Sequence, residues 1–193
     1  MRNSRSSLRG FCTLLLVPAL VAAGQVIERV DDKRWTDAYD YHFRKYAKHY
    51  FGPGVDWRWF KAQAIAESTL NPKAKSKTGA IGLMQILPST FAEIKEANPH
   101  FHSIKEPKWN IAAGIYYDRT LYRRWAGHIS GGERLNFALA SYNAGFGNVR
   151  KAYRKARDQH GSVGRWKQVA SFAPSQTRHY VRRIQRLMGM RGS

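Results

Sequence analysis

Glu67 has the clearest chemical potential in this sequence, because it is an isolated acid in an apolar segment. It follows the apolar residues 64–66 and is the only acidic residue between Asp56 and Glu93. Burial disfavours a charged carboxylate and would raise its pKa from about 4.3 toward about 6. A carboxylic acid of that strength can donate a proton to a leaving oxygen near neutral pH. The alternative is an exposed glutamate at a helix end, which is where glutamate is ordinarily found.

The segment after Glu67 combines turn-forming residues with polar side chains. Asn-Pro at residues 71–72 ends the preceding helix, because a residue before proline avoids helical dihedrals. A loop over residues 73–82 contains Ser76, and Gly-Leu-Met-Gln follows at 82–85. Taken alone, Ser76 is a turn former. A second motif, Tyr-Asn-Ala-Gly, stands at residues 142–145 and is, taken alone, a helix C-terminus with an aromatic anchor.

In this order and at these spacings, the motifs resemble the catalytic domain of the lytic transglycosylases. This is the soluble-type family with a goose-lysozyme-like fold. The shared pattern is Glu-Ser near a helix end, Asn-Pro, a serine nine residues past the glutamate, Gly-Leu-Met-Gln and Tyr-Asn-Ala-Gly. The resemblance covers about residues 35–188, and the spacing is more akin to the catalytic module of the membrane-bound forms. It implies an enzyme that cleaves the glycan strands of peptidoglycan.

The resemblance also implies roles for individual residues. Glu67 would act first as the acid and then as the base. Gln176 departs from the pattern, because related domains often carry glutamate there, which leaves open how strongly that side binds substrate. Six residues would surround the sugars: Ser76, Met84, Gln85, Tyr142, Asn143 and Tyr180. Of these, Ser76 would hydrogen-bond the N-acetyl group of the substrate.

One carboxylate suffices for glycan cleavage if the substrate supplies its own nucleophile. In the implied mechanism, Glu67 protonates the glycosidic oxygen and the acetamido oxygen of N-acetylmuramic acid captures the anomeric carbon as an oxazolinium. The ionised Glu67 then deprotonates the sugar's 6-hydroxyl, which closes a 1,6-anhydro ring. An intramolecular attack has a high effective concentration, so no bound water is required. Two alternatives stay open: a hydrolytic muramidase, and a noncatalytic module that binds cell wall or nucleic acid.

The elements that must position these residues have helical patterns. Asp56 is expected to be the N-cap of a helix that carries Glu67 and ends near Ser68. No segment alternates as a strand would, so we expect an all-α, compact domain. The resemblance implies that this is a lysozyme-like helical domain. The expected helical segments are 35–51, 56–68, 88–97, 110–125, 133–142, 148–157 and 175–188.

The first 24 residues have the pattern of a secretory signal peptide. Arg2, Arg5 and Arg9 precede a mostly apolar stretch over 11–23 that ends in small residues. We therefore expect a signal peptide at 1–24, a catalytic domain at 25–193, and export to the periplasm or cell envelope. The alternative is an uncleaved N-terminal anchor. Cys12 is the only cysteine and lies in this segment, so no disulfide is expected.

The charge of the chain predicts an anionic partner. There are 33 Lys+Arg against 13 Asp+Glu, which gives a formal net charge of +20. The export signal favours the cell envelope over nucleic acid. No histidine pair is spaced with an acid as metal ligands are, so neither a metal nor another cofactor is expected. A basic helix face is expected either to contact anionic envelope surfaces or to be merely solvated: Arg150, Lys151, Arg154, Lys155 and Arg157.

Overall fold

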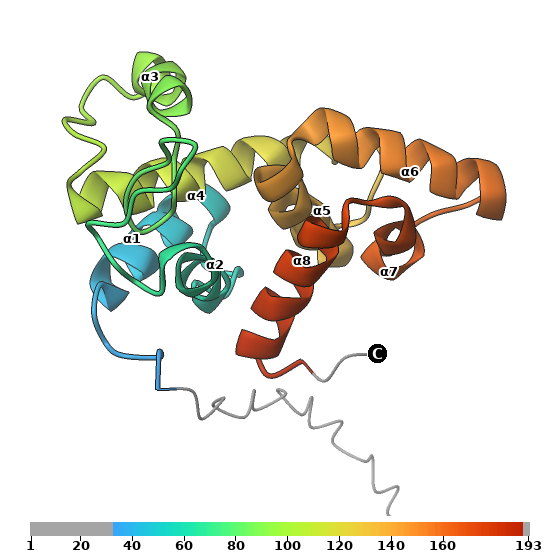
Figure 1. Ribbon diagram of the computed structural model, residues 1–193, viewed down its shortest axis with the longest axis horizontal. Coiled ribbons are helices and arrows are strands. Elements are labelled where there is room, and N and C mark those ends of the chain that lie inside the picture. The colour runs from blue at the N-terminus through green and yellow to red at the C-terminus, as the bar shows by residue number, and fades with distance from the viewer. Residues whose placement is uncertain (1–32, 191–193) are drawn as a thin grey trace, which may run out of the picture.

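The computed structural model describes residues 33–190, which form eight α-helices and one short 3-10 helix, η1 (Figure 1). The expected signal peptide at 1–24 lies outside the described residues. Within them there is no strand, only isolated bridges between Lys75 and Ile81 and between Ile81 and Ile86, which confirms the all-α expectation. The elements are α1 (Asp40–Phe51), α2 (Arg58–Ser68), α3 (Pro88–Ala97), α4 (Pro107–Arg124), α5 (Gly131–Ala144), α6 (Phe146–His160), α7 (Trp166–Val169), η1 (Ala170–Phe172) and α8 (Ser175–Leu187).

Two hydrophobic cores hold these helices together, and α4 runs from one to the other (Figure 1). One core gathers α1, α3 and the first half of α4; the other gathers α5, α6, α7 and α8. Helix α2 contributes to both, with Phe60 and Ala64 in the first core and Ala62 and Ile65 in the second. The helix that carries Glu67 is therefore fixed from two sides.

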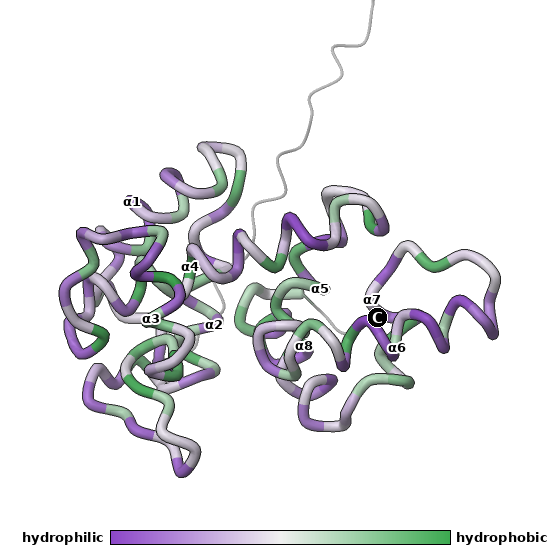
Figure 2. The backbone as a smooth tube through the Cα atoms, turned by 90° about the horizontal axis from the view of Figure 1, so that it is seen from above, coloured by the Kyte–Doolittle hydropathy of each residue, from purple (hydrophilic) through white to green (hydrophobic). Residues whose placement is uncertain are grey.

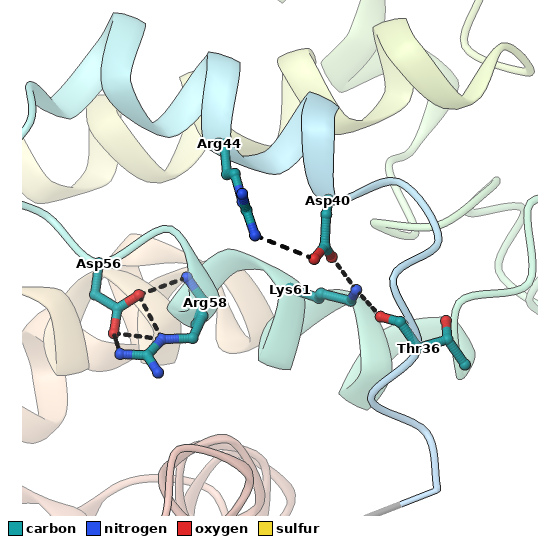
Figure 3. A network of polar contacts seen from close by, with 6 residues as sticks. All are labelled: Thr36, Asp40, Arg44, Asp56, Arg58 and Lys61. Atoms are coloured by element: carbon teal, nitrogen blue, oxygen red, sulfur yellow. Dashed lines mark hydrogen bonds and ion pairs between the residues drawn. The ribbon is translucent and has the colours of Figure 1, made fainter. Parts of the chain in front are cut away.

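A buried cation secures the start of α2 against α1 (Figure 3). The Lys61 side chain is fully buried, and its ammonium group binds the Asp40 carboxylate and the Thr36 carbonyl. Asp40 also pairs with Arg44 one turn along α1 at 3.6 Å. A buried ammonium is stable only when it is paired and hydrogen-bonded in this way. These contacts tie the segment before α1, α1 itself and α2 into one unit.

Five of the expected helix ends, at residues 51, 68, 88, 97 and 175, coincide with the structure, and the others differ by one to five residues. Helix α3 spans the expected residues and α2 ends at Ser68, as expected. Helix α4 begins three residues earlier than expected, at Pro107, because proline suits the first turn of a helix. The N-cap of α2 is Trp57 and not Asp56. Asp56 still serves this end, since its Oδ1 accepts the Arg58 backbone N–H at 3.0 Å and its Oδ2 pairs with the Arg58 guanidinium at 2.6 Å (Figure 3).

The loop between α2 and α3 is folded onto α4 through a single asparagine. The Asn110 side chain accepts a hydrogen bond from the Met84 N–H at 2.8 Å and donates to the carbonyls of Ile81 and Ile104, each at 2.9 Å. Gly82 makes this approach feasible: its φ is +79°, and a Cβ there would lie 2.5 Å from the Asn110 amide nitrogen. The loop that follows Glu67 is thus held against a helix of the core.

Helix α6 is rich in hydrophilic residues (Figure 2). Its apolar side chains Val149, Ala152 and Ala156 are buried in the second core, while the five basic residues between 150 and 157 are all exposed. Among residues 33–190, no helix is both long and apolar enough to cross a membrane.

Candidate active site

Glu67 lies in the last turn of α2, half-buried, with its carboxylate facing α8. The Tyr180 hydroxyl donates a hydrogen bond of 2.6 Å to Glu67 Oε1. Burial raises the pKa of Glu67 from 4.5 to about 7, although the bond from Tyr180 and the charge of Arg183 act in the opposite direction. The carbonyl end of a helix also disfavours a nearby negative charge. Glu67 is therefore a carboxylic acid that gains and loses its proton near neutral pH.

Helix α8 supplies two groups that hold the Glu67 helix end. Tyr180 is almost fully buried, and burial together with the Glu67 charge raises the pKa of its hydroxyl well above the ordinary value. It thus stays a neutral donor. Arg183, one turn further along α8, donates to the carbonyls of Ala66 at 3.2 Å and Ile65 at 3.4 Å. These are carbonyls near the end of α2, where a cation is favourable.

Tyr142 joins the loop to the same region. Its hydroxyl donates to the Met84 carbonyl at 2.8 Å, and its ring packs edge-on against Tyr117 at 5.3 Å. Burial and the charges of Asp118 and Glu67 raise the pKa of Tyr142 well above its usual value. Met84, expected to line the sugar subsites, instead has its side chain fully buried, next to Gly114. Met84 contacts Tyr142 through its backbone carbonyl, because its apolar side chain packs in the hydrophobic core.

Ser76 and Gln85 lie in the loop, and their hydrogen bonds stay within it. Ser76 Oγ accepts the Ala80 N–H at 2.9 Å and contacts Thr78 Oγ1 at 2.9 Å. The Gln85 amide nitrogen donates to the Gly82 carbonyl at 3.0 Å. Gln85 has a φ of +47°, a left-handed conformation that costs a non-glycine residue about 1 kcal/mol and is concentrated at functional sites.

Asn143 and Gln176 flank the N-terminal end of α8. The Thr177 hydroxyl donates to Asn143 Oδ1 at 2.9 Å, which links the end of α5 to the first turn of α8. Gln176, the residue that departs from the family pattern, is exposed. Asn143 therefore positions Tyr180 indirectly, through the helix that carries it.

Sequence reasoning missed a second carboxyl group in the neighbourhood of Glu67. Asp118 of α4 is fully buried. Burial and the Glu67 charge raise the pKa of Asp118, and burial and the charges of both carboxyl groups raise the pKa of Tyr180. The separation of Glu67 from other acids along the chain concealed this proximity, which arises from packing. A usable signal existed: Asp118 falls on the helical face of Ile111 and Ile115, both fully buried.

The assembled groups can perform acid–base chemistry at a partly exposed position. Glu67 offers a proton near neutral pH, and Tyr180 and Arg183 stabilise the carboxylate that remains. Asp118 has no exposed surface, so it cannot act on a bound molecule directly. Among residues 33–190, no three His, Cys, Asp or Glu side chains come together as metal ligands would.

Comparison with known proteins places this geometry in a family. The sequence profile described as "Transglycosylase SLT domain" matches residues 43–163. The membrane-bound lytic murein transglycosylase F of Shewanella pealeana is 34% identical over 148 residues, covering 77% of this chain and 28% of that protein. The Vibrio cholerae protein of the same name is 34% identical over 141 residues, covering 73% of this chain and 24% of the relative.

Solved structures agree with the sequence comparisons. The crystal structure of the 70-kDa soluble lytic transglycosylase of Escherichia coli is similar with a TM-score of 0.64 and 28% identity, covering 80% of this chain and 24% of that one. Its complex with bulgecin A also has a TM-score of 0.64, with 30% identity. This chain thus spans only about a quarter of the length of these relatives. Since the family profile covers more than half of its residues, the chain belongs to the transglycosylase SLT domain family.

Proposed function

We propose that this protein is a peptidoglycan lytic transglycosylase. It would cleave the β-1,4 bond between N-acetylmuramic acid and N-acetylglucosamine and leave 1,6-anhydromuramic acid ends. Membership of the transglycosylase SLT domain family supports the proposal, as do relatives named as lytic murein transglycosylases. No cofactor is part of the proposed reaction, because Glu67 and the substrate supply every reacting group.

The observation that carries the proposal is the state of Glu67. A half-buried carboxyl with a pKa of about 7 can be protonated before the reaction and ionised during it. In the first step the Glu67 proton moves to the glycosidic oxygen, the bond from that oxygen to the anomeric carbon breaks, and the acetamido oxygen bonds to that carbon. In the second step the 6-hydroxyl oxygen replaces the acetamido oxygen and its proton returns to Glu67. The atoms balance without water.

The residues around Glu67 fit roles in this reaction. Tyr180 steadies the ionised Glu67 through its hydrogen bond of 2.6 Å. Tyr142, held by the Met84 carbonyl, is proposed to orient the reacting sugar, with Asn143 shaping the same wall. Ser76 is proposed to hydrogen-bond the N-acetyl group. Gln85, whose left-handed backbone marks a constrained position, is proposed to contact a neighbouring sugar.

Digestion of purified sacculi with mass analysis of the products tests the function. The parent protein should release muropeptides with 1,6-anhydromuramic ends, and Glu67→Gln should reduce release at least about a thousandfold, because the proton donor is gone. Glu96→Gln removes an exposed acid on α3 and should cleave like the parent. Reducing muramic acid ends would instead establish the hydrolytic muramidase. Release by Glu67→Gln at the parent's rate would refute the catalytic assignment.

We also propose that residues 1–24 direct export and that the enzyme works in the periplasm or cell envelope. The charge distribution and the substrate support this location. Sequencing of the N-terminus of the protein recovered from the envelope fraction should find a start near residue 25. An N-terminus at Met1 would show that the segment is kept as an anchor.

The basic surface supports a second partner, the anionic groups of the envelope. The exposed residues of α6 form one positive face. A surface pocket of about 280 Å³ between α5, α7 and α8 is a second concentration of positive charge. Its basic lining residues are Arg165, Lys167, Arg178, Arg182 and Arg186. Binding through these groups should weaken as salt screens the charges, and binding to sacculi that does not change with salt would refute the proposal.

A further inference from the structure

Asp118 is a fully buried carboxyl group with a single hydrogen-bond partner among residues 33–190. The Gln63 side-chain nitrogen, on α2, donates to Asp118 Oδ1 at 3.3 Å. Within residues 33–190 no Lys, Arg or His forms an ion pair with Asp118. An ionised carboxylate in the protein interior is costly unless it is paired or surrounded by donors. The environment of Asp118 therefore does not suit a negative charge.

The second oxygen of Asp118 and the amide oxygen of Gln63 show which hydrogen bond this pair lacks. Asp118 Oδ2 and Gln63 Oε1 are both buried, and neither has a hydrogen-bond partner in the part of the chain that the structure describes. Each is only an acceptor while Asp118 is ionised, so neither can satisfy the other. Turning the Gln63 amide over does not help, since its oxygen would then replace the nitrogen as the neighbour of Oδ1. A proton on Asp118 Oδ2 would turn that atom into a donor, and Gln63 Oε1, on the side chain that already binds Oδ1, is a buried acceptor that could receive the hydrogen bond.

The groups around Asp118 also favour its neutral form. From α2 it faces Gln63 and Glu67, from α5 Tyr142, and from α8 Tyr180, with Tyr117 beside it on α4. Helices α1 and α3 also pack on α4 but contribute no titratable group that shifts Asp118. Burial and the Glu67 charge raise the pKa of Asp118 well above its ordinary value, and the bond from Gln63 offsets this only in part.

We propose that Asp118 is a neutral carboxylic acid whose O–H group donates a hydrogen bond to Gln63 Oε1, and that this acid–amide pair is a positioning device for Glu67. Two hydrogen bonds, N–H···O and O–H···O, would then join α4 to α2 one turn before Glu67. The pair links the helices without placing a second negative charge beside the catalytic acid. This role of Asp118 rests on the proposed function of Glu67.

The absence of that second charge matters for the reaction. Glu67 must ionise when it protonates the glycosidic oxygen, and a charged carboxylate nearby would oppose this step. An ionised Asp118 would push the pKa of Glu67 above its value of about 7. With Asp118 neutral, Glu67 can ionise beside it and later recover its proton.

Asp118→Asn tests the proposal, because asparagine has the same shape and can donate to Gln63 Oε1 without carrying a charge. The pH profile of kcat/KM for sacculus cleavage should match that of the parent to within about 0.3 pH unit, with activity retained to within about threefold. If Asp118 were ionised, removing its charge would move the alkaline limb to lower pH by about one unit or more, and that result would overturn the proposal. Asp158→Asn, an exposed acid of α6, is the matched control.

Asp118→Leu tests whether Asp118 acts through its hydrogen bonds to Gln63 or only fills space in the core. Leucine leaves the buried Gln63 amide without partners, so cleavage should fall at least about tenfold below that of Asp118→Asn, without a matching change in KM. Equal activity of the two variants would contradict the positioning role.

NMR spectroscopy of the parent protein measures the protonation state of Asp118 directly, so it tests the neutral pair independently of the proposed function of Glu67. The ¹³C resonance of Asp118 Cγ, identified by its loss in Asp118→Asn, should stay at the position of a protonated acid from about pH 5 to about pH 8. A resonance at the carboxylate position would refute the neutral pair whether or not the protein cleaves sacculi. If the resonance behaves as expected but Glu67→Gln cleaves normally, the proposed function alone fails.

Discussion

The proposed catalytic role of Glu67 predicts that the activity of this protein depends on pH. The group must hold its proton to act as an acid, so kcat/KM should fall as pH rises through the pKa of about 7. Tyr180→Phe removes the hydrogen bond that favours the ionised form, so the pKa of Glu67 should rise. The alkaline limb of the profile should then move to higher pH by about one unit. A limb that stays in place or moves to lower pH would show that the bond of 2.6 Å does not act on the catalytic proton.

Single residues were predictable from the sequence where they belong to a local pattern. Glu67 and Tyr180 lie 113 positions apart but were both expected at one site, and the structure joins them by a hydrogen bond. Asp118 was not expected there, because its proximity to Glu67 arises from tertiary packing, in which the Gln63 side chain joins α2 to α4. The core position of the Met84 side chain was missed for the same reason, since Gly114 of α4 makes room for it.

At the scale of elements, the contact between α8 and the end of α2 should tune Glu67 electrostatically. Arg183→Met removes a positive charge that lowers the pKa of Glu67 and two hydrogen bonds to α2 carbonyls. The alkaline limb should move to higher pH, and the free energy of unfolding should fall by about 1 kcal/mol. Arg182→Met is the control, because Arg182 is exposed and lines the surface pocket instead. A similar shift in both variants would mean that net charge, not this contact, is responsible.

The loop after α2 depends on a glycine at its closest approach to α4. Gly82→Ala would force the new methyl group against the Asn110 amide, which makes three hydrogen bonds. We expect a loss of at least about 2 kcal/mol in unfolding free energy and a higher KM for glycan. Gly79→Ala is the control, because Gly79 also has a positive φ, of +89°, but a Cβ there would meet no atom within 4 Å. Backbone strain alone should therefore lower its unfolding free energy by about 1 kcal/mol. Chemical denaturation of both variants tests the difference; equal losses would exclude the steric explanation.

Helix positions were more predictable than helix ends. Periodic apolar residues located the seven longer helices, because one face of each must pack against a core. The first helix begins at Asp40, five residues later than expected, because Tyr39 has a left-handed backbone conformation, with a φ of 65°, that a helix cannot continue through. Helix α7 and η1 were not expected, since elements of four and three residues are too short to show a period.

Within residues 33–190, the candidate acid–base site is separate from the basic face of α6. Glu67 lies on α2, which contributes to both cores, whereas α6 packs in the second core alone and its basic residues are exposed. Within residues 33–190, no ion pair neutralises those cations. Charge on this face can therefore attract an anionic wall without acting directly on the protonation of Glu67.

This separation makes a prediction about binding and catalysis. Replacing Arg150, Arg154 and Lys155 together by glutamine should weaken binding to sacculi about tenfold at low ionic strength, measured by co-sedimentation in the Glu67→Gln background. Cleavage of a short soluble glycan by the same triple variant with Glu67 intact should match the parent.

A control triple variant distinguishes the α6 face from net charge. Replacing Lys45, Lys48 and Lys108 by glutamine removes the same three charges from the exposed surface around α1 and the start of α4. If the α6 face directs binding, the control should lose much less affinity at low salt, and the difference should vanish at high salt because screening removes the contribution of both faces. Equal losses would show that the wall responds only to the total charge of the protein. A loss that persists at high salt would mean that the α6 residues contact the wall through something other than their charge.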